Sequence, residues 1–247
     1  MTVAEARSFF PRGLAQPENG YRFSLDSLLL GSFARVKRGW RGADLGCGSG
    51  AVSLALLLGT DVENLGITGV ELDEEALNCA KKNAEQLGFK DCFHFVSQDV
   101  SAFRDGEQQM DFVLMNPPYR EPDRGRVSRG DARSQARFEA AGTLSDFIGC
   151  AARLLKSRGR LFVVFLPERL QALFRELERH RLAAKRLLMV HGKAGVESKI
   201  VLVEAVKDGG EGLTVMPPLV LYDADGAMTP AALEFCPHLA CNAREGA

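Results

Sequence analysis

The chain has 247 residues, of which 46% are hydrophobic and 26% are charged, and this composition suits a globular protein with one α/β domain. Its formal net charge of -1 excludes a strong overall field toward nucleic acid, so affinity for RNA must come from a local patch. The start of the chain lacks the apolar core of a secretion signal, and the apolar runs are too short to span a membrane. The six cysteines form no CxxC pair, which indicates reduced thiols and a cytoplasmic protein.

From about residue 40 the hydrophobic pattern alternates between short apolar runs and helical periodicity. The runs predict strands near residues 43–45, 65–72, 92–96, 110–115, 161–166, 186–190 and 200–205. The helical spacing predicts helices at residues 51–58, 74–87, 144–155 and 170–180. This alternation predicts a doubly wound, mostly parallel seven-stranded sheet of Rossmann-like type. The last two strands have no helix between them, so one strand near the sheet edge should be antiparallel.

A glycine-rich turn, Asp44-Leu45-Gly46-Cys47-Gly48-Ser49-Gly50, joins the first predicted strand to the next helix. Glycines permit a tight turn and let a ligand approach the backbone closely. Glu71 closes the second strand, where a carboxylate accepts hydrogen bonds from both ribose hydroxyls in doubly wound folds. Asp99 follows the third strand and is placed to accept from an adenine amino group. A nicotinamide dinucleotide would use a similar turn, but the GxGxG spacing and the tetrapeptide below argue against it.

The tetrapeptide Asn116-Pro117-Pro118-Tyr119 follows the fourth predicted strand, at the edge where ligands bind in open α/β sheets. An exocyclic NH2 conjugated to a ring or a carbonyl is a poor nucleophile, because its lone pair is delocalised. We expect the Asn116 side-chain oxygen and the Pro117 carbonyl to accept its two N–H bonds, which returns the lone pair to the reacting face. Pro118 stiffens the turn, and Tyr119 can stack on a planar target. Orientation then supplies most of the catalysis, without a strong general base.

Together these motifs resemble those of class I S-adenosylmethionine-dependent methyltransferases over the whole span from Asp44 to Tyr119. The resemblance implies S-adenosylmethionine as the cofactor. It also implies cofactor contacts from the turn and the strand ends, namely Asp44, Gly46, Gly48, Gly50, Glu71, Leu72, Asp99, Val100 and Asn116.

The NPPY sequence serves two acceptors in known families, adenine N6 in nucleic acids and the glutamine amide of release factors. The glutamine enzymes typically carry a helical domain ahead of the glycine turn, and the segment before Asp44 is too short for one. N5-glutamine methylation remains an alternative. Methylation of another RNA and a non-catalytic nucleotide- or RNA-binding module on the same fold also remain open.

A closer resemblance covers nearly the full chain. Residues 20–33, which look extended up to residue 30, and residues 132–139 and 217–226 are similar to bacterial tRNA1(Val) adenine-N6 methyltransferases, which act on the purine next to the anticodon. That family implies an N-terminal lid (residues 1–39), a methyltransferase domain (40–206) and a C-terminal extension (207–247). It also implies lid contacts to the cofactor from Phe23, Asp26 and Ser27. A simple helix cap is the alternative role for Asp26 and Ser27.

The insertion at residues 120–142 is rich in arginine, with six arginines and three acidic residues between residues 120 and 137. If residues 131–141 are helical, Arg133 and Arg137 share one face. A basic segment beside a pocket for a flipped base suits phosphate contacts, so tRNA or another structured RNA is the expected partner. Lys193 and Lys199 would extend this patch. The alternative is that the insertion is only a solvated loop.

Near the C-terminus, Cys236, His238 and Cys241 lack a fourth ligand, so we expect no metal site.

Overall fold

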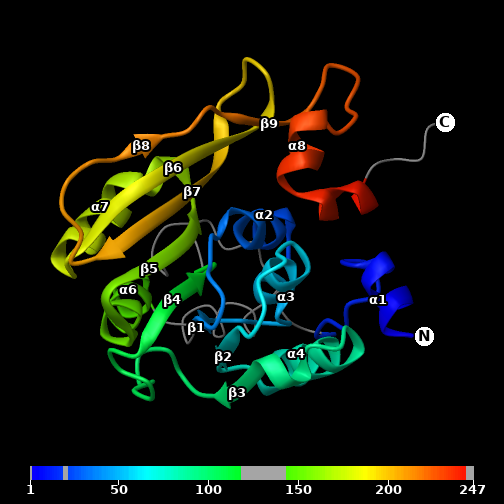
Figure 1. Ribbon diagram of the computed structural model, residues 1–247. Coiled ribbons are helices and arrows are strands. Elements are labelled where there is room, and N and C mark those ends of the chain that lie inside the picture. The colour runs from blue at the N-terminus through cyan, green and yellow to red at the C-terminus, as the bar shows by residue number, and fades with distance from the viewer. Residues whose placement is uncertain (1, 19–21, 118–142, 243–247) are drawn as a thin grey trace, which may run out of the picture.

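The computed structural model describes residues 2–18, 22–117 and 143–242, and one mixed sheet runs through its centre (Figure 1). The strands of the sheet are β1 (Arg41–Leu45), β2 (Gly66–Glu71), β3 (Phe93–Ser97), β4 (Met110–Met115), β5 (Leu155–Phe165), β6 (Leu182–Lys193), β7 (Ser198–Lys207), β8 (Thr214–Val215) and β9 (Leu219–Tyr222). Their order is β3-β2-β1-β4-β5-β7-β6-β8, with β9 also paired to β6. Strands β1 to β5 pair in parallel, whereas β7 is antiparallel to both β5 and β6. The predicted doubly wound, mostly parallel sheet with one antiparallel strand is confirmed.

Helices cover both faces of this sheet. The described helices are α1 (Val3–Phe9), α2 (Leu25–Phe33), α3 (Ala51–Leu58), α4 (Glu74–Gln86), α6 (Leu144–Leu154), α7 (Leu170–Arg179) and α8 (Pro230–Phe235), with short 3-10 turns η1 (Lys90–Cys92), η2 (Pro167–Arg169) and η3 (Pro237–Asn242). Helices α2, α3 and α8 contribute to the core on one face, and α6 and α7 contribute to the core on the other. Helix α4 packs against β2 and β3. Within the described ranges, no helix is both long and apolar enough to cross a membrane.

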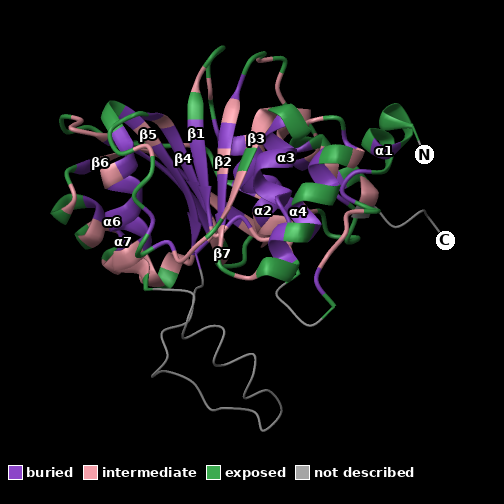
Figure 2. Ribbon diagram, turned by 90° about the horizontal axis from the view of Figure 1, so that it is seen from below, coloured by how far each residue is buried: buried purple, intermediate pink, exposed green. Residues whose placement is uncertain are grey.

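The two cores follow from the two-residue period of the strands. In β4, Phe112 and Leu114 point into the core beneath α2 and α3, and Val113 and Met115 point into the core beneath α6 and α7. A strand buried on both faces needs a continuous apolar run, which is what the sequence has at residues 112–115. Figure 2 shows the result, with buried strands between helices whose outer faces are exposed.

The sheet has nine strands, so the predicted number of seven is wrong. The two additional strands, β8 and β9, come from the C-terminal part of the chain, and both pair in parallel with β6. Pro217 and Pro218 lie between them. Proline has no backbone N–H to donate, so the prolines divide what would be one edge strand into two short ones.

The segment that looked extended contains α2, so that prediction is wrong from Leu25 onward. Ser24, with extended backbone angles, occupies the N-cap position, which rules out the cap role considered for Asp26 and Ser27. Tertiary packing stabilises the helix, because Leu28, Leu29, Leu30 and Phe33 are all buried in the core. A Cβ on Gly31 would lie 2.7 Å from that of Ala55, so glycine permits the close approach of α2 and α3.

Candidate functional site

The candidate site lies at the sheet edge where β1, β2, β3 and β4 end. Leu45, the last residue of β1, is in register with Val70 of β2 and with Met115 of β4, and Glu71 is in register with Ser97 of β3. The residues that follow these positions therefore leave the sheet side by side. The strand register brings the glycine turn, Glu71, Asp99 and Asn116 to one edge, as expected for ligand sites in open α/β sheets.

The glycine turn presents an open backbone surface. Gly46, Gly48 and Gly50 all have positive φ angles, of 67°, 53° and 81°. The amides of Gly46 and Cys47 donate to the Val70 carbonyl at 2.8 and 3.1 Å, which ties the turn to β2. A Cβ on Gly48 would meet no described atom within 4 Å, so a ligand can reach the backbone there. Only glycine combines this φ with that access.

Glu71 is held in place by two backbone amides. Its Oε2 accepts from the Gly48 amide and its Oε1 accepts from the Asp73 amide, both at 2.9 Å. Burial raises the pKa of the Glu71 carboxyl above its ordinary value, and the two amide bonds oppose that rise. Each carboxylate oxygen has more than one lone pair, so Glu71 can still accept from a ligand's hydroxyl groups.

Asp44 is a buried carboxylate with an unfilled acceptor. Its side chain is 1% exposed, and Oδ2 accepts from the Ser53 hydroxyl at 2.6 Å. The other oxygen, Oδ1, is buried and has no hydrogen-bond partner among the residues that the structure describes. Burial raises the pKa of Asp44 to about 6. Buried acceptors are normally paired, so this site fits a ligand that brings a donor, best of all a cationic one.

The turn after β3 supplies the next group of predicted residues. Asp99 Oδ1 accepts from the Ser101 amide at 2.7 Å, which fixes the direction of its carboxylate. Val100 is buried beside it. Leu72, which follows Glu71, leaves 44% of its surface exposed. An apolar side chain next to two oriented carboxylates suits a ligand with a flat apolar body and polar edges.

Asn116 emerges from β4 and contacts α2. Its Nδ2 donates to the Ser27 hydroxyl at 3.3 Å, and Ser27 is itself buried. This bond joins the N-terminal segment to the predicted catalytic residue. Phe23 packs half-buried against the core under α2, and Asp26 lies in the first turn of that helix. Pro117 is buried.

Several predicted residues lie outside the described part of the chain. They are Pro118 and Tyr119 of the tetrapeptide and, with the rest of insertion 120–142, Arg133 and Arg137.

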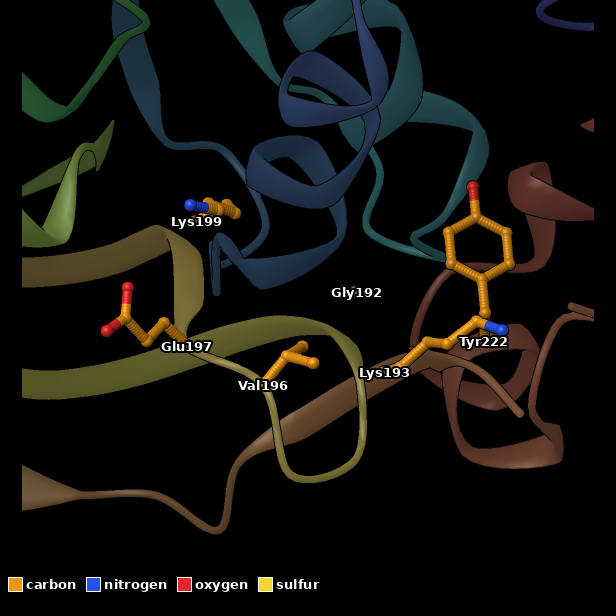
Figure 3. Close-up of a pocket in the computed structure, with 6 residues that line it drawn as sticks. All are labelled: Gly192, Lys193, Val196, Glu197, Lys199 and Tyr222. Carbon is orange, nitrogen blue, oxygen red and sulfur yellow. The ribbon is translucent and has the colours of Figure 1, made fainter. Parts of the chain in front are cut away.

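Lys193 and Lys199 lie at a hollow of about 470 Å³ between the β6–β7 turn and β9 (Figure 3). Strand β6 is antiparallel to β7, and β7 is antiparallel to β5, so β6 ends on the same sheet edge as β4. Lys193 lies beside Tyr222 and donates to the Ala224 carbonyl at 3.0 Å. Three exposed carboxylates lie in the β6–β7 turn and in the turn after β9, next to these lysines, and offset their positive charge: those of Glu197, Asp223 and Asp225.

Sequence reasoning missed two polar residues that hold the site. Ser53 donates to Asp44, and Asn83, which is fully buried on α4, donates to the Ser49 carbonyl in the glycine turn at 2.9 Å. Asn83 carries a signal that could have been found. It is a polar residue on the same helix face as the buried Ala76 and Ala80.

Cys236, His238 and Cys241 serve the packing of the C-terminal segment. His238 makes an edge-on contact with the Phe10 ring, and the Cys241 thiol lies 3.0 Å from the His238 carbonyl. The described residues contain no group of three His, Cys, Asp or Glu side chains that could hold a metal ion.

Comparison with known proteins relates the chain to methyltransferases. The model of the methyltransferase small domain family matches residues 25–186. A tRNA1(Val) (adenine(37)-N6)-methyltransferase from Yersinia enterocolitica is 30% identical over 213 residues, which cover 85% of this chain and 81% of the relative.

Solved structures support the fold. A predicted O-methyltransferase from Agrobacterium tumefaciens has a TM-score of 0.69 at 22% identity, covering 86% of this chain and 96% of its own. An S-adenosylmethionine-dependent O-methyltransferase from Thermotoga maritima has a TM-score of 0.56 at 17% identity, covering 85% and 73%. The chain uses S-adenosylmethionine as its methyl donor and is related to the tRNA1(Val) (adenine(37)-N6)-methyltransferases. It therefore belongs to the methyltransferase small domain family.

Proposed function

We propose that this protein methylates the N6 nitrogen of an adenine in RNA, with tRNA at the purine next to the anticodon as the first candidate. The observation that carries the proposal is the position of Asn116. It leaves β4 beside the glycine turn, and its amide is oriented by Ser27. The named activity of the Yersinia relative supports the choice of adenine in tRNA.

The cofactor supplies a methyl group bonded to a positively charged sulfur. In our proposal Glu71 accepts from the ribose hydroxyls and Asp99 accepts from the adenine amino group, with Leu72 and Val100 against the adenine ring. Asp44 faces the ammonium group, because its Oδ1 has no hydrogen-bond partner among the described residues. Gly48 lets the cofactor approach the backbone closely, and Gly46 and Gly50 supply the positive φ angles that the turn beneath it needs.

The N-terminal segment completes this proposal. Phe23, Asp26 and Ser27 would lie over the cofactor, with residues 1–39 acting as a lid on the domain at 40–206 and residues 207–247 as its extension. The Ser27–Asn116 bond supports this, because it brings α2 to the predicted catalytic residue.

The chemistry asked of the protein is hydrogen bonding and alignment. The Asn116 side-chain oxygen and the Pro117 carbonyl accept the two N–H bonds of the target amine, which restores its lone pair to the reacting face. In this proposal Tyr119 stacks on the base, and Pro118 stiffens the turn that presents the Pro117 carbonyl. The bond from Asn116 Nδ2 to Ser27 supports the role, because it fixes the plane of the amide. Such prealigned acceptors act mainly on the transition state.

RNA contacts are proposed for Arg133, Arg137, Lys193 and Lys199. The position of the lysines supports this, because they lie on the sheet edge that also carries Asn116. Because Glu197, Asp223 and Asp225 lie in the turns next to them, the lysines should contribute local contacts and little long-range attraction.

The test is to treat total RNA from a strain lacking this protein with purified enzyme and S-adenosylmethionine. We expect N6-methyladenosine in nucleoside mass spectra, and fragment mapping should place it in the anticodon loop of a tRNA. N6-methyladenosine in a different RNA would correct the substrate and keep the chemistry. Methylation of a release-factor glutamine, with none on RNA, would overturn the proposal.

A further inference from the structure

Asn83 joins three parts of the molecule that are far apart in sequence. Its side chain, on α4, is 0% exposed and makes three hydrogen bonds. Nδ2 donates to the carbonyls of Ala15 and Ser49, each at 2.9 Å, and Oδ1 accepts from the Ala15 amide at 2.7 Å. A buried amide with both donors and its acceptor paired holds its neighbours in one arrangement.

The bond to Ser49 acts on the glycine turn. Ser49 directly precedes Gly50, the N-cap residue of α3, and the Gly50 amide donates to the Cys47 carbonyl at 2.8 Å. Gly48, on the other side of Ser49, donates to Glu71. Asn83 therefore fixes the peptide group between Ser49 and Gly50, within the glycine turn of the proposed cofactor site.

The bonds to Ala15 act on the N-terminal segment. The Asn83 amide pairs with both backbone groups of Ala15, and the Glu18 amide donates to Glu75 Oε1 at 2.7 Å. Residues 15–18 therefore follow α4 from Asn83 toward the end of β2. The turn and the segment share one buried side chain, so displacing either of them leaves polar groups of Asn83 unpaired in the core and loosens its hold on the other.

We propose that Asn83 is a positioning residue for cofactor binding, which couples the glycine turn to residues 15–18. Cofactor affinity then depends on this part of the N-terminal segment even where it makes no contact with the cofactor. The inference rests on the proposed placement of the cofactor at the glycine turn, and it is independent of the methyl acceptor.

The first test replaces Asn83 by aspartate, which has the same shape but lacks the NH2 donors. Asn83→Asp should weaken binding of S-adenosylhomocysteine about tenfold in calorimetry, since both carbonyls lose their donor. The KM for S-adenosylmethionine should rise while kcat at saturating cofactor is retained. Asn78→Asp, the same change on the exposed face of α4, is the matched control and should leave both constants unchanged.

The second test approaches the same bond from the other partner and covers the case in which Asn83→Asp does not fold. Ala15→Pro removes the N–H that donates to Asn83, and Ala15→Ser keeps it. Ala15→Pro should weaken S-adenosylhomocysteine binding and Ala15→Ser should not. If Asn83→Asp and Ala15→Pro act through one contact, the double variant should bind S-adenosylhomocysteine about as weakly as whichever single variant has the lower affinity.

Hydrogen exchange gives a readout that simple destabilisation would not produce. Because coupling between sites is reciprocal, S-adenosylhomocysteine should slow exchange of the Ala15 amide in the native protein and fail to do so in Asn83→Asp. A folded Asn83→Asp or Ala15→Pro protein with native affinity would overturn the inference, even if its melting temperature fell. If Glu71→Ala loses binding while folded Asn83→Asp binds like the native protein, this inference alone is overturned. Native binding in Glu71→Ala would overturn the cofactor placement itself.

Discussion

The candidate site lies along the sheet edge where β1, β2, β3, β4 and β6 end, and the two halves of this edge are built differently. On the half formed by β1, β2 and β3, the polar groups are carboxylates oriented by neighbouring donors, as at Asp44, Glu71 and Asp99. On the half from β4 to β9, Asn116 is half-buried, and Lys193 and Lys199 are exposed at the end of β6 and the start of β7. The first half matches a small ligand of fixed shape, and the second presents an open surface.

This difference predicts how each half should respond to change. Water screens exposed charges, so single lysines contribute little, whereas a buried acceptor left without its ligand partner has a large effect. Cofactor recognition should therefore depend on a few single residues, and acceptor recognition on the sum of many. The exception on the acceptor half is Asn116, because it acts on the reacting nitrogen.

The largest effect should come from Asn116→Ala. Turnover should fall by on the order of 10²–10³, as on loss of one group that stabilises a transition state. S-adenosylhomocysteine affinity should change far less than turnover, since Asn116 is one of several expected cofactor contacts and the change acts mainly on the acceptor amine. Single-turnover assays and calorimetry measure the two quantities. Near-native turnover would remove Asn116 from the catalytic role.

Glu71→Ala should have the next largest effect, on cofactor affinity. Hydrogen bonds to a charged acceptor are worth roughly 1.5–3 kcal/mol, so the dissociation constant should rise about tenfold or more. Glu74→Ala is the matched control, because Glu74 is exposed in the first turn of α4. Equal effects of the two changes would contradict a specific role for Glu71.

Cofactor affinity should also depend on pH through Asp44. Burial raises its pKa from 3.8 to about 6, and an ammonium partner needs the ionised form. Affinity for S-adenosylhomocysteine should therefore fall by up to about tenfold per unit as pH drops below about 6. Asp44→Asn should bind S-adenosylhomocysteine weakly and lose this dependence of affinity on pH. Asp61→Asn, on an exposed loop, should keep the native pH dependence.

The same shift predicts the stability of the cofactor-free protein. The folded state binds more protons than the unfolded state between pH 3.8 and about 6, because the folded pKa of Asp44 is the higher one. The free energy of unfolding contributed by this group therefore falls as pH rises through that window. Urea titrations of native protein and Asp44→Asn at several pH values would show this component, and its absence would contradict the raised pKa.

A smaller effect is expected from the arginine-rich insertion. Arg133→Ala with Arg137→Ala should reduce the salt slope of log K for tRNA by about 0.7–0.9 per lost phosphate contact. Cofactor affinity should not change. Equal salt slopes for native and variant protein would indicate that the arginines are only solvated.

The smallest effect should come from Lys193→Ala with Lys199→Ala. Nearby carboxylates offset their charge, so tRNA affinity at physiological salt should change less than in the arginine variant. Filter binding of both variants under the same conditions makes the comparison. A larger loss in the lysine variant would place the main RNA contacts at the hollow beside Tyr222.

The sequence by itself determined most elements and their order. Helix α3 and strand β4 have the predicted bounds, because a two-residue or 3.6-residue period is a local property. Strands β5 and β6 begin earlier than predicted, at Leu155 and Leu182, since their first residues are partly polar and join the sheet by pairing with neighbours. The glycine turn and the strand-end residues followed from the same local patterns.

Only the tertiary structure decided which distant groups meet. Helix α2 depends on burial against α3, and β8 and β9 depend on pairing with β6, so the local pattern did not determine which segments these elements join. The contact of Ser27 with Asn116 joins residues 89 positions apart, and that of Asn83 with Ala15 joins residues 68 apart. Such pairs depend on where whole segments dock, and hydrophobic burial determines the docking. The polar residues that docking brings together show no periodic pattern in the sequence, so the sequence alone does not reveal their contacts.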